Sequence, residues 1–215
     1  DNISHYPKTF SWGVPGERQI FLATTGNLAT SQAVISTLSE NTKKTNKKNS
    51  SILKAQSFFQ IARIISQTLS DVIENTAKGQ QEGENTFSST FILGGQISGS
   101  PMSLYLIYPE GNFIEVSEDF SFFQIGETKY GRPILVRAFD PKMNFEDAIK
   151  LLMVSFDSTI KANLSVGLPF DLHVYKDNSL APATKYKIEK ENPYFKMISS
   201  EWGRALKSSL TALPS

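Results

Sequence analysis

Cysteine is missing from all 215 residues of the sequence. Its absence excludes disulfide bonds, thiolate metal sites and a cysteine nucleophile. Histidine is scarce as well, because only His5 and His173 are present. A zinc site would therefore depend on carboxylates, and a Ser-His-Asp triad would have to use one of these two residues.

Net charge is also close to absent, since 22 Lys and Arg residues face 21 Asp and Glu residues. No large electrostatic field favours a nucleic acid or an anionic membrane as a partner. No apolar run approaches the ~20 residues that span a bilayer, and the polar start at Asp1 is unlike a signal peptide. We therefore expect no nucleic-acid partner and no membrane segment. The absence of cysteine suits a reducing compartment and is compatible with either side of a membrane, and we expect a cytoplasmic location.

The composition is that of an ordinary globular chain, with 40% hydrophobic and 20% charged residues. No repeat or second domain boundary is needed, so we expect one domain over residues 1–215, with residues 181–215 as a C-terminal extension. The lysine-rich tract 41–51 is polar enough to be a mobile surface loop. Its alternative interpretation is a basic docking patch.

Hydrophobic periodicity predicts two groups of strands and two pairs of helices. Strands or extended segments are expected at 10–12, 19–24, 86–93, 104–108, 113–116, 120–124 and 170–175. Helices are expected from Leu28 to Leu38 with Asn27 or Thr30 as the cap, and at 52–77, 133–137, 144–161 and 194–210. Helices grouped in pairs argue against a parallel sheet with crossover helices. The order predicts an α+β fold, a four-layer αββα sandwich.

Two apolar stripes should pack on the two sheets. The first is Phe58, Ile61, Ile65 and Leu69, and the second is Ile149, Leu152 and Phe156. The pair Gly94-Gly95 is expected to end a strand in a flexible turn, because it lacks the lysine and the helix start of a phosphate loop.

Three corners could carry chemistry. Thr25-Gly26 ends a strand directly before a helix, where backbone N–H groups can hold an oxyanion. Gly126-Glu127 marks a second strand-to-helix corner, and residues 162–167 separate the long apolar helix from the last strand. Without further information, Gly26 would be read as a plain helix-entry turn, and Asn163 and Ser165 as loop caps.

Several long stretches resemble the bacterial Anbu family, which is proteasome-like and of the ancestral beta-subunit type. They are TGNLAT at 25–30, FILGGQI at 91–97, LIYPEGNFI at 106–114, FQIGETKYGRPIL at 123–135 and SFDSTIKANLSVGLP at 155–169. The resemblance runs in order from Asp1 to about Leu180, and the remaining residues match loosely.

This resemblance implies the N-terminal-nucleophile hydrolase fold and a threonine-type peptidase without cofactor or metal. In that class a processed N-terminal threonine attacks the scissile carbonyl, with its own amine as the base. Position by position, Lys8 matches the active-site lysine and Gly26 the glycine whose N–H holds the oxyanion. Asn163 stands near an aspartate of the wider class, and Ser165 and Glu127 each stand near a serine, as catalytic residues.

The resemblance also implies a homo-oligomeric ring or open spiral that hydrolyses peptide or protein substrates. The segment that carries the nucleophilic threonine has no counterpart from Asp1 onward, so the peptidase chemistry is expected when such a segment is present in the native protein. Peptidase activity depends on that segment, and the alternative is a non-catalytic assembly subunit of the same fold. An unfoldase partner is not indicated by any residue. If Lys8 is catalytic, we expect its ammonium to point toward the Gly26 N–H.

Overall fold

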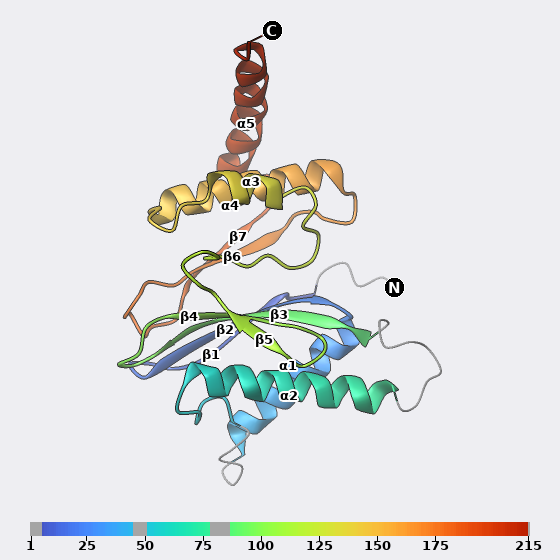
Figure 1. Ribbon diagram of the computed structural model, residues 1–215, viewed down its shortest axis with the longest axis vertical. Coiled ribbons are helices and arrows are strands. Elements are labelled where there is room, and N and C mark those ends of the chain that lie inside the picture. Colours follow the sequence, from blue (N-terminus) through green and yellow to red (C-terminus); the bar gives the residue numbers. More distant parts are fainter. Residues whose placement is uncertain (1–5, 45–50, 78–86, 215) are drawn as a thin grey trace. The chain divides into compact units, whose positions relative to one another are not determined.

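The computed structural model describes residues 6–44, 51–77 and 87–214 (Figure 1). Contacts divide the chain into unit 1, Asp1–Gly126 with Val174–Thr184, and unit 2, Glu127–His173 with Lys185–Ser215. His5 and residues 45–50 of the lysine-rich tract lie outside the described residues, so the predicted mobile loop is untested there.

Unit 1 is built on a five-stranded antiparallel sheet in the order β1-β2-β3-β4-β5. Its strands are β1 (Thr9–Val14), β2 (Arg18–Gly26), β3 (Ser89–Ile97), β4 (Ser103–Ile107) and β5 (Phe113–Glu115). Neighbouring strands in this sheet follow one another in sequence, as in a meander. A turn at Pro15-Gly16 closes the first hairpin, with the Glu17 N–H donating to the Val14 carbonyl at 2.9 Å.

Two helices, α1 (Leu28–Lys43) and α2 (Phe58–Ala77), lie side by side on one face of this sheet (Figure 1). The Asn27 side chain accepts a hydrogen bond from the Thr30 N–H and so caps α1, as one of the two predicted candidates. The predicted stripe of α2 is confirmed as core. Phe58, Ile61, Ile65 and Leu69 are at most 6% exposed and belong to the cluster that includes Leu22 and Leu93.

The predicted turn at Gly94-Gly95 is wrong, because both residues lie within β3 and pair with strands on either side. Gly95 has a φ of +144°, and a Cβ atom there would lie 2.1 Å from the Gln19 carbonyl oxygen and 2.8 Å from the Phe58 ring. The glycine is therefore present for close approach of a strand and a helix, and it does not end the strand.

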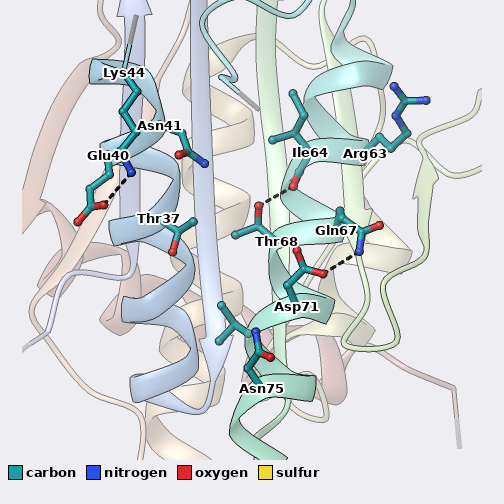
Figure 2. Close-up of a pocket in the computed structure, with 11 residues that line it drawn as sticks. Thr37, Glu40, Asn41, Lys44, Arg63, Ile64, Gln67, Thr68, Asp71 and Asn75 are labelled. Carbon is teal, nitrogen blue, oxygen red and sulfur yellow. Dashed lines mark hydrogen bonds and ion pairs between the residues drawn. The ribbon is translucent and has the colours of Figure 1, made fainter. Parts of the chain in front are cut away.

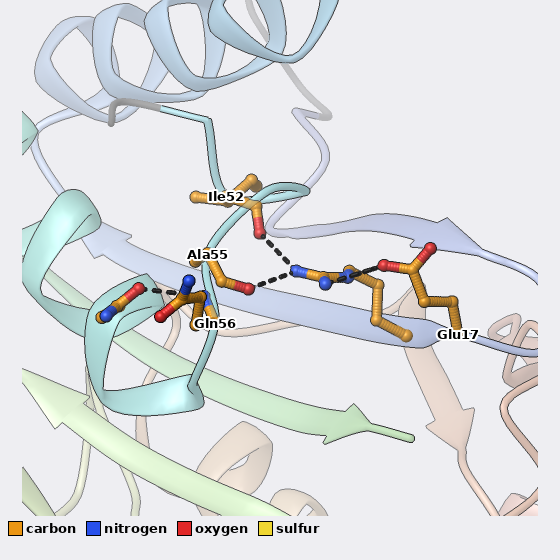
Figure 3. A network of polar contacts seen from close by, with 6 residues as sticks. Glu17, Ile52, Ala55 and Gln56 are labelled. Atoms are coloured by element: carbon orange, nitrogen blue, oxygen red, sulfur yellow. Dashed lines mark hydrogen bonds and ion pairs between the residues drawn. The ribbon is translucent and has the colours of Figure 1, made fainter. Parts of the chain in front are cut away.

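The start of the second helix was also predicted too early, because residues 51–57 form turns and α2 begins at Phe58. The Arg18 guanidinium reaches these turns from β2 and donates to the carbonyls of Ala55 at 2.7 Å and Ile52 at 3.5 Å (Figure 3). Arg18 is only 7% exposed, and Glu17 pairs with it at 2.7 Å. The buried charge is satisfied by Glu17 and by these carbonyls, and the Ser57 hydroxyl accepts from the Gln60 N–H where α2 begins.

Replacing Arg18 by methionine should lower the free energy of unfolding by about 2 kcal/mol. The apolar stem is kept, but the charge-assisted hydrogen bonds to Ala55 and Ile52 are lost. Denaturant unfolding measures the change, and Arg63→Met at an exposed position is the control. Equal stabilities of the two variants would contradict the role given to Arg18.

The segment 174–184 is anchored within unit 1 by the buried side chain of Gln96, which is 1% exposed. Its amide nitrogen lies 3.0 Å from carboxylate and amide oxygens of Asp177 and Asn178. Its amide oxygen accepts from the Tyr175 hydroxyl and the Asn178 N–H, both at 2.9 Å. These bonds fix the segment to the end of β3.

Unit 2 contains three helices and most of β6 (Phe170–Val174) and β7 (Thr184–Ile188), which pair in a two-stranded sheet. The helices are α3 (Arg132–Ala138), α4 (Phe145–Ala162) and α5 (Pro193–Thr211), and α4 contacts both of the others. Their shared core consists of Met153, Val154, Ile188, Phe195 and Ile198.

The second predicted stripe is only partly buried in unit 2. Ile149 packs against the core, whereas Leu152 and Phe156 are 40% and 42% exposed. Phe156 still stacks on the Phe170 ring, with the ring centroids 4.9 Å apart. Strand β7 was not predicted, because its four exposed residues mask the alternation that indicates a strand. No helix among the described residues is long and apolar enough to cross a membrane.

Candidate active site

Lys8 and Gly26 lie at the same end of the hairpin formed by β1 and β2. The strands pair in register from Val14 opposite Arg18 to Thr9 opposite Ala23, and Lys8 directly precedes Thr9. The Lys8 carbonyl then accepts a hydrogen bond from the Thr24 N–H at 2.9 Å. This bond places Lys8 opposite Thr24, which precedes Gly26 by two residues on β2.

The Gly26 backbone turns where β2 leads into α1. Its φ of +101° lies in the region that favours glycine, and a Cβ atom there would come 2.5 Å from the Ser88 carbonyl oxygen. The next amide, Asn27 N–H, donates to that carbonyl at 2.8 Å and so faces β3. Because amides alternate in direction along a strand, the Gly26 N–H lies on the same edge as the Thr24 N–H, which faces Lys8.

The Lys8 side chain belongs to an exposed residue. An exposed ammonium keeps its hydration and needs no carboxylate partner. The expectation that it points toward the Gly26 N–H stays a prediction, while the backbone register supports the closeness of the two residues.

The three remaining candidate residues form one hydrogen-bonded network in unit 2. The Asn163 side-chain amide donates to the Glu127 carboxylate at 2.9 Å. Its oxygen accepts from the Ser165 N–H at 2.9 Å and from the Ser165 hydroxyl at 2.7 Å. Asn163 ends α4, so the helix terminus fixes the centre of the network. The sequence named these three residues separately, and the structure joins them by hydrogen bonds.

His173 lies on β6 outside this network, and its pKa is lowered by burial and by the nearby Lys185 charge. Among the described residues, no group of three or more His, Cys, Asp or Glu side chains is placed to hold a metal ion.

A polar groove of about 570 Å³ runs between α1 and α2 in unit 1 (Figure 2). Three of the charged side chains in its walls have partners there: Lys44 and Glu40 form an ion pair at 3.4 Å, and Asp71 accepts a hydrogen bond from Gln67 at 2.8 Å. No candidate catalytic residue lines it. We assign it no part in the chemistry.

Buried hydroxyls around the turn at Gly26 were missed in the sequence. Thr24, Ser31 and Ser89 are at most 5% exposed, although strand and helix positions facing a core are normally apolar. The sequence did contain one signal. Thr24 follows Ile20 and Leu22 on the buried face of β2, where the alternating pattern would place an apolar residue.

Solved structures cover nearly the whole chain. Anbu (ancestral beta-subunit) from Yersinia bercovieri is 35% identical, over 99% of this chain and 87% of that chain, with a TM-score of 0.91. The chain belongs to the Anbu family. The helical assembly of the Anbu complex from Pseudomonas aeruginosa is 39% identical, over 100% and 88% of the two chains, with a TM-score of 0.91. For Anbu from Hyphomicrobium sp. strain MC1 the identity is 38%, the coverage 100% and 88%, and the TM-score 0.89.

These Anbu structures confirm the family and the α+β proteasome-like fold class expected from the sequence. No family model matches the sequence, and no curated protein matches it. The Anbu assignment rests on the solved structures, which are 35%, 38% and 39% identical over nearly the whole chain.

Proposed function

We propose that this Anbu chain is a subunit of a self-assembling threonine-type peptidase that hydrolyses peptide bonds in peptide or protein substrates. The main support is the pairing of the first hairpin. Lys8 lies opposite Thr24, two residues before Gly26, on the side of β2 toward which the Gly26 N–H points. The nucleophile in this proposal is a threonine at the processed N-terminus of the native protein, with its α-amine as the base. An amine with an unperturbed pKa of about 8 suits that task.

Lys8 and Gly26 have separate electrostatic roles. The Lys8 ammonium stabilises the threonine alkoxide as it forms, because an opposite charge within a few ångströms favours the ionised state. The Gly26 N–H donates to the oxygen of the tetrahedral intermediate, on which negative charge develops. Neither role needs a cofactor or a metal ion.

Glu127, Asn163 and Ser165 are proposed as further catalytic residues. The Glu127 carboxylate supplies a negative charge that can accept a hydrogen bond from an ammonium group, and Asn163 holds it in one orientation. Ser165 fixes Asn163 in turn through two hydrogen bonds. Asn163→Ala should therefore weaken catalysis by releasing both neighbours.

A peptide boronate tests the chemistry, because it forms a bond to an activated threonine hydroxyl. Intact mass of the native protein should reveal an N-terminal threonine, and the boronate should inhibit hydrolysis of a fluorogenic peptide. A native protein that lacks the threonine, or an active one that ignores the boronate, would contradict the proposal.

The second candidate function is a non-catalytic assembly subunit of the same family. It is favoured by the amide of Asn163, which carries no charge at a position where relatives of the wider class have an aspartate. The mass measurement separates the two functions. In either case we propose a cytoplasmic location without nucleic-acid or membrane partners.

Self-association is expected for both functions. Apolar residues on α5, namely Leu206 and Leu210, are 51% and 71% exposed, and a Pseudomonas aeruginosa relative forms a helical assembly. Static light scattering of the native protein at micromolar concentration should give a large homo-oligomer, in ring or open-spiral form. A stable monomer under these conditions would rule out the self-assembling subunit.

A further inference from the structure

Three buried hydroxyl groups connect the two sides of the turn at Gly26. The Thr24 hydroxyl lies 2.7 Å from the Ser31 hydroxyl, and the Ser31 hydroxyl lies 3.2 Å from that of Ser89. The Ser89 hydroxyl donates to the Asn27 carbonyl at 2.9 Å. Thr24 precedes Gly26 by two residues and Asn27 follows it directly, so this hydroxyl chain joins residues on both sides of the glycine.

The direction of every hydrogen bond in the hydroxyl chain follows from its last member. A carbonyl only accepts, so the single Ser89 hydrogen is committed to Asn27. Ser31 must then donate to Ser89, and Thr24 must donate to Ser31. Hydrogen bonds that run one way strengthen each other in a site of low polarity, and exposures of 5%, 2% and 1% for Thr24, Ser31 and Ser89 exclude competing water.

The three hydroxyls come from three elements, since Thr24 is on β2, Ser31 on α1 and Ser89 on β3. The Asn27 carbonyl also accepts the Ser31 N–H at 3.0 Å, which is the first hydrogen bond of α1. Strand, helix and turn are therefore tied together at the residue next to Gly26.

We propose that the hydroxyl chain of Thr24, Ser31 and Ser89 is a positioning device that holds the Gly26 N–H in the direction required of an oxyanion donor. This inference rests on the proposed peptidase function. An oxyanion donor must point at the place where charge will develop, and small errors in its position reduce the rate strongly. The hydroxyl chain supplies this rigidity without contacting the substrate, so its members are positioning residues.

Ser89→Ala in the full-length native complex is the decisive variant. We expect kcat for a fluorogenic peptide to fall roughly 10-fold, with KM within about twofold, because orientation of the donor matters most in the transition state. Ser31→Ala and Thr24→Val should have smaller effects, since the bond from Ser89 to Asn27 survives. Thr24→Ser keeps the hydroxyl and should retain the wild-type kcat.

The matched control is Ser66→Ala. Ser66 is also a buried serine of unit 1 whose hydroxyl donates to a backbone carbonyl, that of Gly111, but it lies on α2 outside the turn. It should lower the melting temperature about as much as Ser89→Ala and leave kcat unchanged. A Ser89→Ala variant with wild-type kcat, or equal losses of kcat in both variants, would overturn the inference.

Hydrogen exchange separates this inference from the proposed function. Amides of residues 24–28 should exchange faster in Ser89→Ala and not in Ser66→Ala, whether or not peptides are cleaved. If the wild-type complex does not hydrolyse peptides, the proposed peptidase function is wrong, and so is the catalytic role of the hydroxyl chain. Unchanged exchange at residues 24–28 in Ser89→Ala would overturn the positioning itself.

Discussion

Lys8→Ala abolishes peptide hydrolysis and leaves the assembly intact: this is the result expected if the lysine stabilises the threonine alkoxide. Loss of one preorganised charge or donor at a developing oxyanion costs roughly 10²–10³-fold in kcat, and we expect at least the upper end, because the charge acts on the nucleophile itself. The assembly should persist, since Lys8 is exposed and outside the hydrophobic core of unit 1.

The measurement is hydrolysis of a fluorogenic peptide together with light scattering on the same sample. Lys142→Ala, which removes another exposed lysine, is the control and should leave both values unchanged. Full hydrolytic activity in Lys8→Ala would refute the assignment. Loss of assembly in that variant would make Lys8 a structural residue.

Gly95→Ala should have the largest effect on stability. A methyl group at this position would overlap the Gln19 carbonyl oxygen at 2.1 Å and the Phe58 ring at 2.8 Å, in a backbone with a φ of +144°. Overpacking and backbone strain each cost about 1–3 kcal/mol, so we expect a loss of about 3–5 kcal/mol in the free energy of unfolding.

Denaturant unfolding measures this loss, and the neighbouring Gly94→Ala is the control. There the nearest atom to an added Cβ is the flexible tip of Leu104, at 3.2 Å. Gly94→Ala should therefore cost less than about 1.5 kcal/mol. Similar values for the two variants would show that the close contact of β3 with β2 and α2 is not what requires Gly95.

The regular parts of the fold could be predicted from local patterns. Alternation along residues 19–24 and the stripe of Phe58, Ile61 and Ile65 each indicate one buried face, and the period of the pattern, two in the first and 3.6 in the second, indicates strand or helix. Asn27 was a cap candidate because its side chain can accept from the backbone three residues later, which is a local property.

Local patterns failed where a distant residue decided the conformation. Residues 52–57 carry mostly helix-forming side chains, but they form turns in which the carbonyls of Ile52 and Ala55 accept from Arg18, and α2 begins only after its cap at Ser57. Gly94-Gly95 looked like the end of a strand, but the approach of Phe58 requires the missing side chain within β3. The partners in both cases are 34 or more residues away.

The sequence by itself determined the Anbu family and the fold class, because these depend on ordered motifs, and it named Lys8 and Gly26 as candidate catalytic residues. Only the tertiary structure decided which polar groups meet. Ser89 reaches Asn27 across 62 residues, and Asn163 reaches Glu127 across 36. Hydrogen bonds require distances near 3 Å and a defined angle, and such geometry between distant residues is set by strand register and helix placement.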